Sequence, residues 1–417
     1  MGLVLSLGFL IGLAFFISYL YQIFYIFVPF IKDEPPTPAG RRNRMAVMIS
    51  ARNEAGVIKH LLESIKAQTY PQELIEIFVV ADNCTDNTAE IAEGEGVHVY
   101  KRFDDINIGK GYAMHYLMDQ IKAEFGENYF DGYFVFDADN VLDSHYIEEM
   151  NNTFSCGYEI LTSYRNSKNY GDNWISAGYA LWFLRESKYL NYPRMLLGTS
   201  CAISGTGFMF SKRVAKELDG WDYYLLTEDI QFTVDHVIND YKIGFCKRAM
   251  LFDEQPNTFR QSVRQRMRWA RGYFQVMCHY GLDLAKTTIE KKSWSCFDMS
   301  MNIMPAIILT LLTTVINGAA FITGLIVGED IIPVLMGIAM GLLSMYILFF
   351  GIGLLTTVTE WRNIYTTTWK KIKYTFTFPL FMMTYMPITF MSLFKHVEWK
   401  PIVHSESKSL ADIKECG

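Results

Sequence analysis

Tyr133-Phe134-Val135-Phe136-Asp137-Ala138-Asp139 is the stretch of this 417-residue chain that decides its fold. Four apolar residues end in two carboxylates that stand one residue apart. A short apolar run bounded by polar residues is typical of a strand that lies inside a sheet. Ligands of parallel sheets bind beyond the carboxyl ends of the strands, which is where these two acids lie.

Strand and helix patterns alternate through the sequence before this run. Strands are predicted at 45–50, 75–80, 97–100 and 133–136, with helices ending near Thr69, Ala92 and Phe125; Asp86 is expected to cap the second helix, and Lys110 to begin the third. This alternation predicts an α/β domain with a mostly parallel sheet that helices cover on both faces. Asp82 follows the second strand, so we expect it at the same edge as Asp137 and Asp139.

Long uncharged runs stand before and after this α/β block. They cover residues 1–31, 299–328, 331–359 and 374–394. Each is long enough to span a hydrocarbon core of about 30 Å, which needs roughly 20 helical residues. Buried core helices are the alternative for the last three, but runs of such length without a charge favour a membrane. The first run is too long for a signal peptide and has no basic start, so we expect an anchor.

The basic residues predict the orientation of these segments. A linker at 32–40 precedes Arg41, Arg42 and Arg44, and basic residues mark the cytoplasmic ends of membrane helices. We therefore expect residues 41–290 to form a cytoplasmic domain of a multi-pass protein of the cell membrane. The loop after 359 is also basic, with Arg362, Lys370, Lys371 and Lys373.

The end of the membrane region, 291–394, carries conflicting signals. Its last run contains Pro379 and Pro387, which break or kink a helix, and basic residues flank the run on both sides. Two half-helices that re-enter the membrane would return the tail, 395–417, to the cytoplasm. A single kinked crossing, which would place the tail outside, is the alternative.

Two stretches of the central block have the composition of interfacial helices. The stretch 258–280 contains five arginines among apolar residues, which predicts a helix at the membrane surface. The stretch 174–192 mixes aromatic and charged residues, and it fits a helix on the bilayer surface as well as an ordinary surface helix of the domain.

Net charge and cysteine usage exclude other classes of protein. A net charge of −6 argues against nucleic acid as a partner. Seven cysteines without a C-x-x-C pair indicate neither a structural zinc site nor a disulfide frame, and fit reduced thiols in a cytoplasmic domain. No feature of the sequence indicates an oligomeric state.

Acidic residues at two places have the pattern of a catalytic site. Asp137 and Asp139 can both approach one hard divalent cation, Mg²⁺ or Mn²⁺, which then keeps positions open for phosphate oxygens. A pair of surface acids is the alternative. In Thr227-Glu228-Asp229 one acid can act as a general base on a hydroxyl. A helix start, with Thr227 as the cap, is a second interpretation that is compatible with the first.

The third pattern is Gln265-Arg266-Met267-Arg268-Trp269. Gln265 and Arg268 are three residues apart and share one face of a helix, with Trp269 beside it. Arg268 can bind a diphosphate with two parallel hydrogen bonds, and Trp269 can stack on a sugar ring. A basic helix at lipid headgroups is the alternative.

Asp82, Asp137-Ala138-Asp139, Thr227-Glu228-Asp229 and the Gln265–Trp269 motif occur in the order that is typical of one family. In this respect residues 41–290 resemble the membrane-bound processive family 2 glycosyltransferases, which include cellulose, chitin, hyaluronan and poly-N-acetylglucosamine synthases. The resemblance implies a GT-A fold, a UDP-sugar donor, a divalent metal and inversion at the anomeric carbon.

The resemblance also implies a role for each matched residue. Uridine would be held by Asp82 and the turn Ala51-Arg52-Asn53-Glu54, the donor phosphates by Lys110, and the metal–diphosphate by Asp137 and Asp139. Asp229, beside Glu228, would be the base. Gln265, Arg268 and Trp269 would bind diphosphate and acceptor, and Ser204-Gly205-Thr206-Gly207-Phe208 would line the acceptor pocket.

Two departures from the family pattern bear on function. Relatives often have Asp-Asp-Gly-Ser where this chain has Ala81-Asp82-Asn83-Cys84, and its membrane region is small. We expect an enzyme that extends a polysaccharide through β-linkages, with secretion of the chain as a further step. A transferase that adds one sugar to a lipid, as ceramide glucosyltransferases do, is the alternative. A membrane scaffold with a degenerate enzyme domain is a third interpretation, against which the intact acids argue.

Overall fold

The computed structural model describes residues 2–33, 37–303, 305–327, 332–395, 397, 404 and 407–415. Parts of the predicted linker, of the loop between the two long apolar runs and of the tail lie outside the described residues, as does Cys416.

An eight-stranded sheet forms the centre of the domain, in the order β3-β2-β1-β4-β7-β6-β8-β5. β1 pairs in parallel with β2 and β4, β2 with β3, and β6 with β8; β7 and β5 run antiparallel to their neighbours. The strands are β1 (Met45–Ala51), β2 (Ile75–Asp82), β3 (His98–Arg102), β4 (Gly132–Asp137), β5 (Val141–Leu142), β6 (Ile160–Ser167), β7 (Phe208–Ser211) and β8 (Ile243–Asp253). The predicted strands and the mostly parallel sheet are confirmed.

Helices cover both faces of this sheet, because alternate residues of the strands point to opposite sides. In β4, Tyr133 and Val135 face one apolar core, and Phe134 and Phe136 face the other. The first core packs α4 (Lys110–Phe125), α6 (Trp174–Glu186) and α9 (Glu228–Ile238); the second packs α2 (Ile58–Lys66), α3 (Thr88–Gly94) and α5 (Tyr146–Phe154).

The helix of 110–125 is confirmed to the residue, but the start of α3 differs from the prediction. Its N-cap is Asn87, whereas Asp86 accepts a hydrogen bond from the backbone N–H of Thr88 at 3.1 Å. Short helices complete the domain: a 3-10 turn at Gln72–Leu74, a π-helical turn at Ser187–Asn191, α7 (Tyr192–Leu197) and α8 (Lys212–Leu218).

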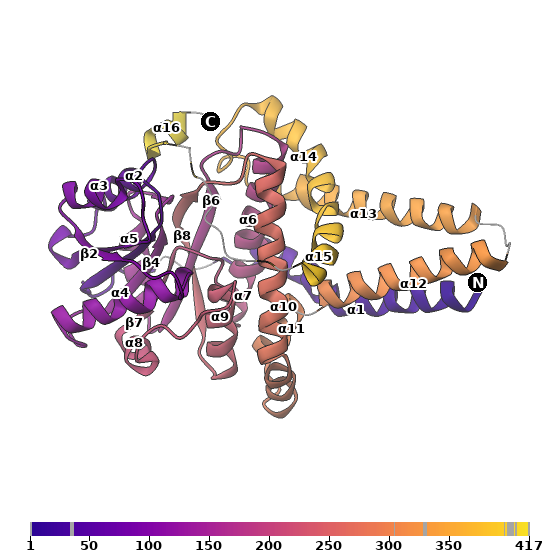
Figure 1. The fold of residues 1–417 in the computed structure, drawn as a ribbon, viewed down its shortest axis with the longest axis horizontal. Helices are drawn as coiled ribbons and strands as arrows, with labels where there is room; N and C mark the ends of the chain where they lie inside the picture. The colour runs from indigo at the N-terminus through magenta and orange to yellow at the C-terminus, as the bar shows by residue number, and fades with distance from the viewer. Residues whose placement is uncertain are drawn as a thin grey trace.

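Three long apolar helices project from the domain on one side (Figure 1): α1 (Gly2–Ile31), α12 (Pro305–Val327) and α13 (Ile332–Thr359). A buried ion pair lies at the base of α1. Arg194 of α7 donates from Nε to Asp298 of α11 (Trp294–Ile303) at 2.7 Å, and Tyr21 and Tyr25 of α1 donate to the same carboxylate. Because both charges are buried, removal of either one would leave the other uncompensated.

Two helical stretches among the described residues are long and apolar enough to cross a membrane, namely Leu335–Thr359 and Thr368–Phe394. The stretch Phe16–Ile31 of α1 is apolar but shorter. The second candidate is not continuous: α14 (Thr368–Met383) ends where α15 (Tyr385–Phe394) begins, with Thr384 at the break. Both helices run across the base of α12 and α13 in Figure 1.

Arg266 holds this break. It lies on α10 (Phe259–Glu290), which stands between the sheet and the projecting helices in Figure 1. Its Nη1 donates to Thr384 Oγ1 at 2.6 Å and to the carbonyl of Phe381 at 3.2 Å. Its guanidinium carbon also lies 4.5 Å from the ring centroid of Phe381 and 4.8 Å from that of Tyr385. This arginine therefore satisfies backbone that the break sets free, rather than pointing toward lipid headgroups.

The helix α6 differs from both interpretations of 174–192. Nearly all of its residues between Ile175 and Leu184 are buried. An added Cβ on Gly178 would lie 2.3 Å from the ring of Phe381, so α14 packs directly against α6. This helix is interior because the broken helix pair covers the face that the sheet leaves free.

Candidate active site

The carboxyl ends of β1, β2 and β4 bring the predicted acids to one edge of the sheet. Asp137 is the last residue of β4, and its backbone N–H donates to Thr206 Oγ1 at 2.9 Å. Asp139 follows in the turn before β5, and its Oδ2 accepts the backbone N–H of Glu254 at 2.9 Å. These bonds fix both carboxylates at the start of one turn.

Lys110 joins this acid pair to the other acidic motif. Its Nζ lies 2.5 Å from Asp137 Oδ1, 2.8 Å from the carbonyl oxygen of Gly205 and 3.7 Å from Glu228 Oε1. The backbone N–H of Gly205 donates to Asp229 Oδ2 at 2.6 Å. A continuous set of contacts thus connects Asp137 with Asp229. Burial opposes the charge of Lys110, but Asp137 and Glu228 outweigh it and raise the pKa of Lys110 above its usual value.

Glu228 and Asp229 occupy the first turn of α9, and Thr227 is its N-cap residue. The Thr227 side chain makes no capping bond, and Oγ1 has no hydrogen-bond partner among the described residues. Burial raises the pKa of both acids, that of Glu228 to about 7, although Lys110 and Arg268 oppose the shift. A carboxylate whose pKa approaches neutrality suits proton transfer at physiological pH.

The segment 204–208, which is predicted to line an acceptor pocket, contacts both Asp137 and Asp229. Gly205 and Gly207 have φ angles of +80° and +66°, which favour glycine. An added Cβ on Gly207 would lie 1.8 Å from Leu251, so no side chain fits there. The hydroxyl of Thr206 bonds to Asn140 Oδ1 at 2.5 Å as well as to Asp137. The Thr206 side chain therefore supports the turn that begins at Asp137 and is buried. Gly207 is buried against Leu251, so of these three residues only Gly205 places its backbone beside Asp229.

The helix α10 brings its motif against the turn before α9. Arg268 Nη1 donates to the carbonyl of Leu226 at 2.8 Å. Gly272 allows this approach, because an added Cβ would lie 2.5 Å from the Thr227 side chain. Gln265 is half-buried, and its Oε1 has no hydrogen-bond partner in the described part of the chain.

Trp269 is held by aromatic neighbours on α6. Its ring lies edge-on to Tyr179, with centroids 5.6 Å apart, and to Phe183, with centroids 6.1 Å apart. The indole is half-buried and keeps part of its surface accessible.

The residues predicted for uridine lie at the neighbouring strand ends. Ala51 pairs with Ala81, so the turn 51–54 stands beside Asp82. Asp82 is buried and accepts a hydrogen bond from Arg102 Nη1 at 2.5 Å. The sequence pattern did not reveal Arg102 as a partner. Its guanidinium occupies one carboxylate oxygen of Asp82, the acid within residues 81–84.

Glu54 contacts a residue from the far end of the chain. His404 Nδ1 lies 2.9 Å from Glu54 Oε2, and His404 Nε2 lies 3.9 Å from Asp139 Oδ2. Burial opposes a charged imidazole, but Asp139 and Glu54 outweigh it and raise the pKa of His404 to about 10. His404 lies 135 residues beyond Trp269, the end of the last sequence motif, so no local pattern pointed to it.

A second missed pair lies at the end of β6 and β8. Arg165 Nε donates to Asp253 Oδ2 at 2.7 Å, and Arg165 Nη1 donates to the carbonyl of Ser204 at 2.7 Å. The pKa of Asp253 rises to about 6 through burial, with Arg165 opposing. This pair fixes the start of the segment that carries Gly205.

The donor set at Asp137 and Asp139 fits a hard divalent cation that takes most of its ligands from a substrate. Both side chains offer carboxylate oxygens, which Mg²⁺ and Mn²⁺ prefer. In the described part of the chain no three His, Cys, Asp or Glu side chains form a cluster that could hold a metal. Two protein ligands leave further positions for phosphate oxygens and water.

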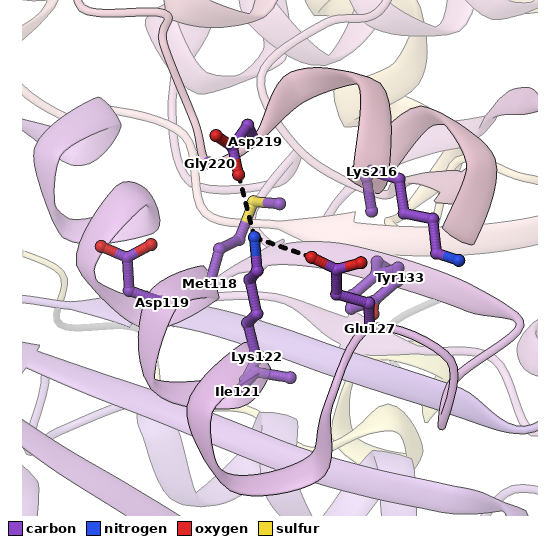
Figure 2. Close-up of a pocket in the computed structure, with 10 residues that line it drawn as sticks. Met118, Asp119, Ile121, Lys122, Glu127, Tyr133, Lys216, Asp219 and Gly220 are labelled. Carbon is purple, nitrogen blue, oxygen red and sulfur yellow. Dashed lines mark hydrogen bonds and ion pairs between the residues drawn. The ribbon is translucent and has the colours of Figure 1, made fainter.

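Another hollow lies at the opposite end of α4, between α4 and α8 (Figure 2). Three of the charged residues that line it pair with each other: Lys122 Nζ lies 2.8 Å from Glu127 Oε1 and 2.9 Å from Asp219 Oδ1. Lys122 stands twelve residues beyond Lys110, about 18 Å along the helix. This hollow is therefore separate from the sheet edge that carries Asp137 and Asp139.

Known proteins are similar to this chain in sequence and in fold. The family model described as "Glycosyltransferase like family 2" matches residues 42–272. A probable glycosyltransferase, YdaM of Bacillus subtilis, is 27% identical over 281 residues, covering 61% of this chain and 60% of the relative. Poly-beta-1,6-N-acetyl-D-glucosamine synthase of Staphylococcus epidermidis is 25% identical over 283 residues, covering 65% and 66%. Beta-monoglucosyldiacylglycerol synthase of Synechocystis is 23% identical over 260 residues, covering 60% and 53%.

Each match thus spans less than two thirds of the curated relative. Among solved structures, a mannosyltransferase from Pyrobaculum calidifontis, in complex with GDP-Man and Mn²⁺, is similar with a TM-score of 0.60 at 14% identity. That similarity covers 93% of this chain and 98% of the other, and it supports the GT-A fold. Because the family model matches more than half of its residues, this chain belongs to glycosyltransferase-like family 2.

Proposed function

We propose that this chain transfers a sugar from a UDP-sugar to the hydroxyl of a growing polysaccharide, with inversion and formation of a β-linkage. One observation carries the proposal: Lys110 Nζ contacts both Asp137 and the carbonyl of Gly205, whose N–H binds Asp229. Groups suited to a leaving diphosphate and a group suited to proton removal therefore meet at one edge of the sheet.

Asp229 takes the proton of the acceptor hydroxyl, whose oxygen attacks the anomeric carbon. The bond between that carbon and the diphosphate oxygen breaks, and UDP leaves with the electron pair. Asp137 and Asp139 hold Mg²⁺ or Mn²⁺, which when bound neutralises the diphosphate. Lys110 and Arg268 add fixed positive charge on the same side, which stabilises the charge that develops there.

The predicted site residues divide between the two substrates, the UDP-sugar donor and the acceptor. The turn Ala51–Glu54 and Asp82 hold uridine, with Arg52 beside that acid. Gln265 and Arg268 bind the diphosphate, and Trp269 offers its accessible surface to a sugar ring of the acceptor. The backbone of Gly205, whose N–H binds Asp229, lines the acceptor pocket, because a glycine lets a sugar approach closely.

The protein acts at the cell membrane, with residues 41–290 on the cytoplasmic side. Support comes from the arginines after the first helix and from the projecting apolar helices α1, α12 and α13. The tail returns to this domain, since Lys414 Nζ lies 2.9 Å from Asp143 Oδ2. That contact favours two half-helices over a single crossing for 374–394.

Transfer of a single sugar to a lipid is the second candidate. The small set of membrane helices favours it, because few helices are available to enclose a polymer. The matched relatives include a poly-beta-1,6-N-acetyl-D-glucosamine synthase and a beta-monoglucosyldiacylglycerol synthase, so their names support one candidate each.

Incubation of the purified full chain with each UDP-sugar and Mg²⁺ or Mn²⁺, followed by sizing of the product, tests the proposal. A long polymer is the expected result. A glycolipid of one added sugar would establish the second candidate instead. Failure to bind or turn over any UDP-sugar, in the presence of lipid and either metal, would contradict both.

A further inference from the structure

A stretch of backbone without helix or strand carries the N–H that contacts Asp229. It consists of residues 202–206 between α7 and β7, which we call the arch. Ala202 exchanges two hydrogen bonds with the side-chain amide of Asn191, at 2.9 and 3.0 Å. Asn191 is the last residue of the π-helical turn and is buried. The arch therefore enters the active site from a fixed start.

The peptide unit between Ser204 and Gly205 is held on both sides. Its carbonyl oxygen accepts a hydrogen bond from Arg165 Nη1 at 2.7 Å. Its N–H donates to Asp229 Oδ2 at 2.6 Å. Because a peptide unit is planar, the direction of its carbonyl fixes the direction of its N–H. The guanidinium of Arg165 therefore sets the line along which this N–H reaches Asp229.

Local sterics do not fix this peptide unit. Gly205 has a φ angle of +80° and no side chain, and glycine adopts many backbone conformations at similar cost. The Ser204 carbonyl also accepts the N–H of Thr206 at 3.0 Å, but that bond lies within the arch and moves with it. The contact with Arg165 on β6 ties the carbonyl to the sheet instead.

Arg165 is itself held on three sides. Nε donates to Asp253 Oδ2 at 2.7 Å, and Nη2 donates to the same oxygen. The guanidinium carbon lies 3.6 Å from the ring centroid of Phe183 on α6. The backbone N–H of Arg165 donates to Ser187 Oγ at 3.2 Å, and Ser187 begins the π-helical turn that Asn191 ends. Such turns occur often at functional sites, and here one turn contacts both Arg165 and the start of the arch.

The order of charges strengthens the bond to Asp229. A cationic guanidinium, the dipole of one peptide unit and a carboxylate follow one another. Hydrogen bonds in series polarise each other, and those to charged groups are the stronger ones. Burial opposes the charge of Arg165, but Asp253 outweighs it and raises the pKa of Arg165, so the guanidinium stays charged. Burial also raises the pKa of Asp229, and the N–H of Gly205 opposes that rise.

We propose that Arg165 is a positioning residue for the catalytic base. Through the Ser204–Gly205 peptide unit it directs an N–H onto Asp229, which holds the carboxylate toward the acceptor hydroxyl. The inference rests on the proposed function, because it takes Asp229 as the base. The alternative is an ion pair of Arg165 with Asp253 that only stabilises the fold, and this predicts no effect that depends on Asp229.

The test is a kinetic double-mutant cycle in the full chain, with Arg165→Met and Asp229→Asn made singly and together. We expect kcat to fall about 10–100-fold in Arg165→Met, because a misplaced catalytic group can cost about 100-fold. In the Asp229→Asn background the same substitution should change the residual transfer by no more than about twofold, because groups that act as a unit are not additive. Equal losses in the two backgrounds would overturn the proposal.

Donor binding separates a role at the base from a role at the donor site. The Kd for UDP in the presence of Mn²⁺ should stay within about twofold of the parent value in Arg165→Met. A rise in Kd as large as the fall in kcat would make Arg165 a donor-binding residue, which contradicts the proposal.

The acid limb of kcat/KM gives a further readout. Weakening of the Gly205 N–H bond lets the pKa of Asp229 rise further, so activity should be lost at a higher pH in Arg165→Met than in the parent. The other groups that act on this carboxylate stay in place in the variant: Glu228, Lys110, Arg268 and Tyr273. An acid limb at the pH of the parent would count against the contact as the cause.

Removal of Arg165 alone leaves the Asp253 carboxylate buried without its partner, which can prevent folding. Arg165→Met combined with Asp253→Asn removes both charges and keeps an oxygen for Gln255 Nε2, which donates to Asp253 Oδ1 at 2.6 Å. Asp253→Asn alone is the matched control, because it removes the ion pair and keeps Arg165 beside the Ser204 carbonyl. We expect kcat in this control to exceed that of the double variant at least about tenfold.

Equal kcat in the control and the double variant would show that the loss follows the ion pair, and the positioning role would then be wrong. A parent chain that neither binds nor turns over a UDP-sugar would instead contradict the proposed function. The two failures are therefore distinguishable.

Discussion

Replacement of Asp229 by Asn should remove the proton acceptor and leave the site intact. Asp229 Oδ2 accepts the Gly205 N–H at 2.6 Å, and an amide oxygen can accept the same bond. Exchange of a charged acceptor for a neutral one weakens this bond within the protein by about 1 kcal/mol. If the whole of that change were passed on to donor binding, the Kd for UDP would rise roughly fivefold. Loss of a general base lowers the rate about 10²–10⁴-fold, equivalent to about 2.7–5.4 kcal/mol. The catalytic loss should therefore exceed any loss of binding.

The assay measures UDP release and sugar incorporation at saturating donor, with UDP affinity determined separately. Asp235→Asn is the matched control, because Asp235 lies on the same helix and accepts the Tyr223 hydroxyl at 2.7 Å through an oxygen that Asn also has. We expect kcat to fall at least about 100-fold in Asp229→Asn and to stay near the parent value in the control. A kcat near that of the parent in Asp229→Asn would refute the assignment of the base.

Further consequences of the site geometry can be measured in the same preparation. Asp139→Asn should weaken the Mn²⁺-dependent part of UDP binding, because a neutral amide replaces a hard oxygen ligand; equal metal dependence in mutant and parent would make the pair a surface feature. Burial raises the pKa of Asp229, so kcat/KM should be lost as the pH falls through a value above about 4, the usual carboxyl range; an acid limb at or below that range would contradict this. Trp269→Ala should reduce sugar transfer more than hydrolysis of the UDP-sugar donor if its ring carries the acceptor, whereas an equal loss of both would indicate a structural role. Arg266→Met should loosen the break at Thr384 and lower thermal stability, and unchanged melting would show that the buried guanidinium is not needed there.

Local sequence determined the sheet and the position of its acids. The strand that ends in Asp137 and the helix that begins at Lys110 follow from the spacing and number of apolar residues, which depend on neighbours a few residues apart. The resemblance to family 2 glycosyltransferases rested on Asp82 and three short motifs in a fixed order, and the family model that matches residues 42–272 confirms the family. For the strand and for the helix, the information lies within one element, so local sequence is enough to express it.

Contacts between distant elements decided the rest. The stretch 258–280, which contains Arg266, has the composition of a helix at lipid headgroups. The Arg266 side chain is nevertheless buried, because α14 ends beside it at Thr384. Likewise, α6 is interior because Gly178 lets the ring of Phe381 approach. Whether a surface faces lipid, solvent or protein depends on what packs over it, and a hydrophobic pattern is the same in each case.

The contact of His404 with Glu54 joins residues 350 positions apart. No propensity or periodicity connects such positions, since the chain between them passes through the whole sheet and the long apolar helices. The sequence by itself therefore determined which chemical groups are present and on which strand ends they stand. Only the tertiary structure decided which of them touch, because contact at this separation is set by the packing of whole elements rather than by the residues between them.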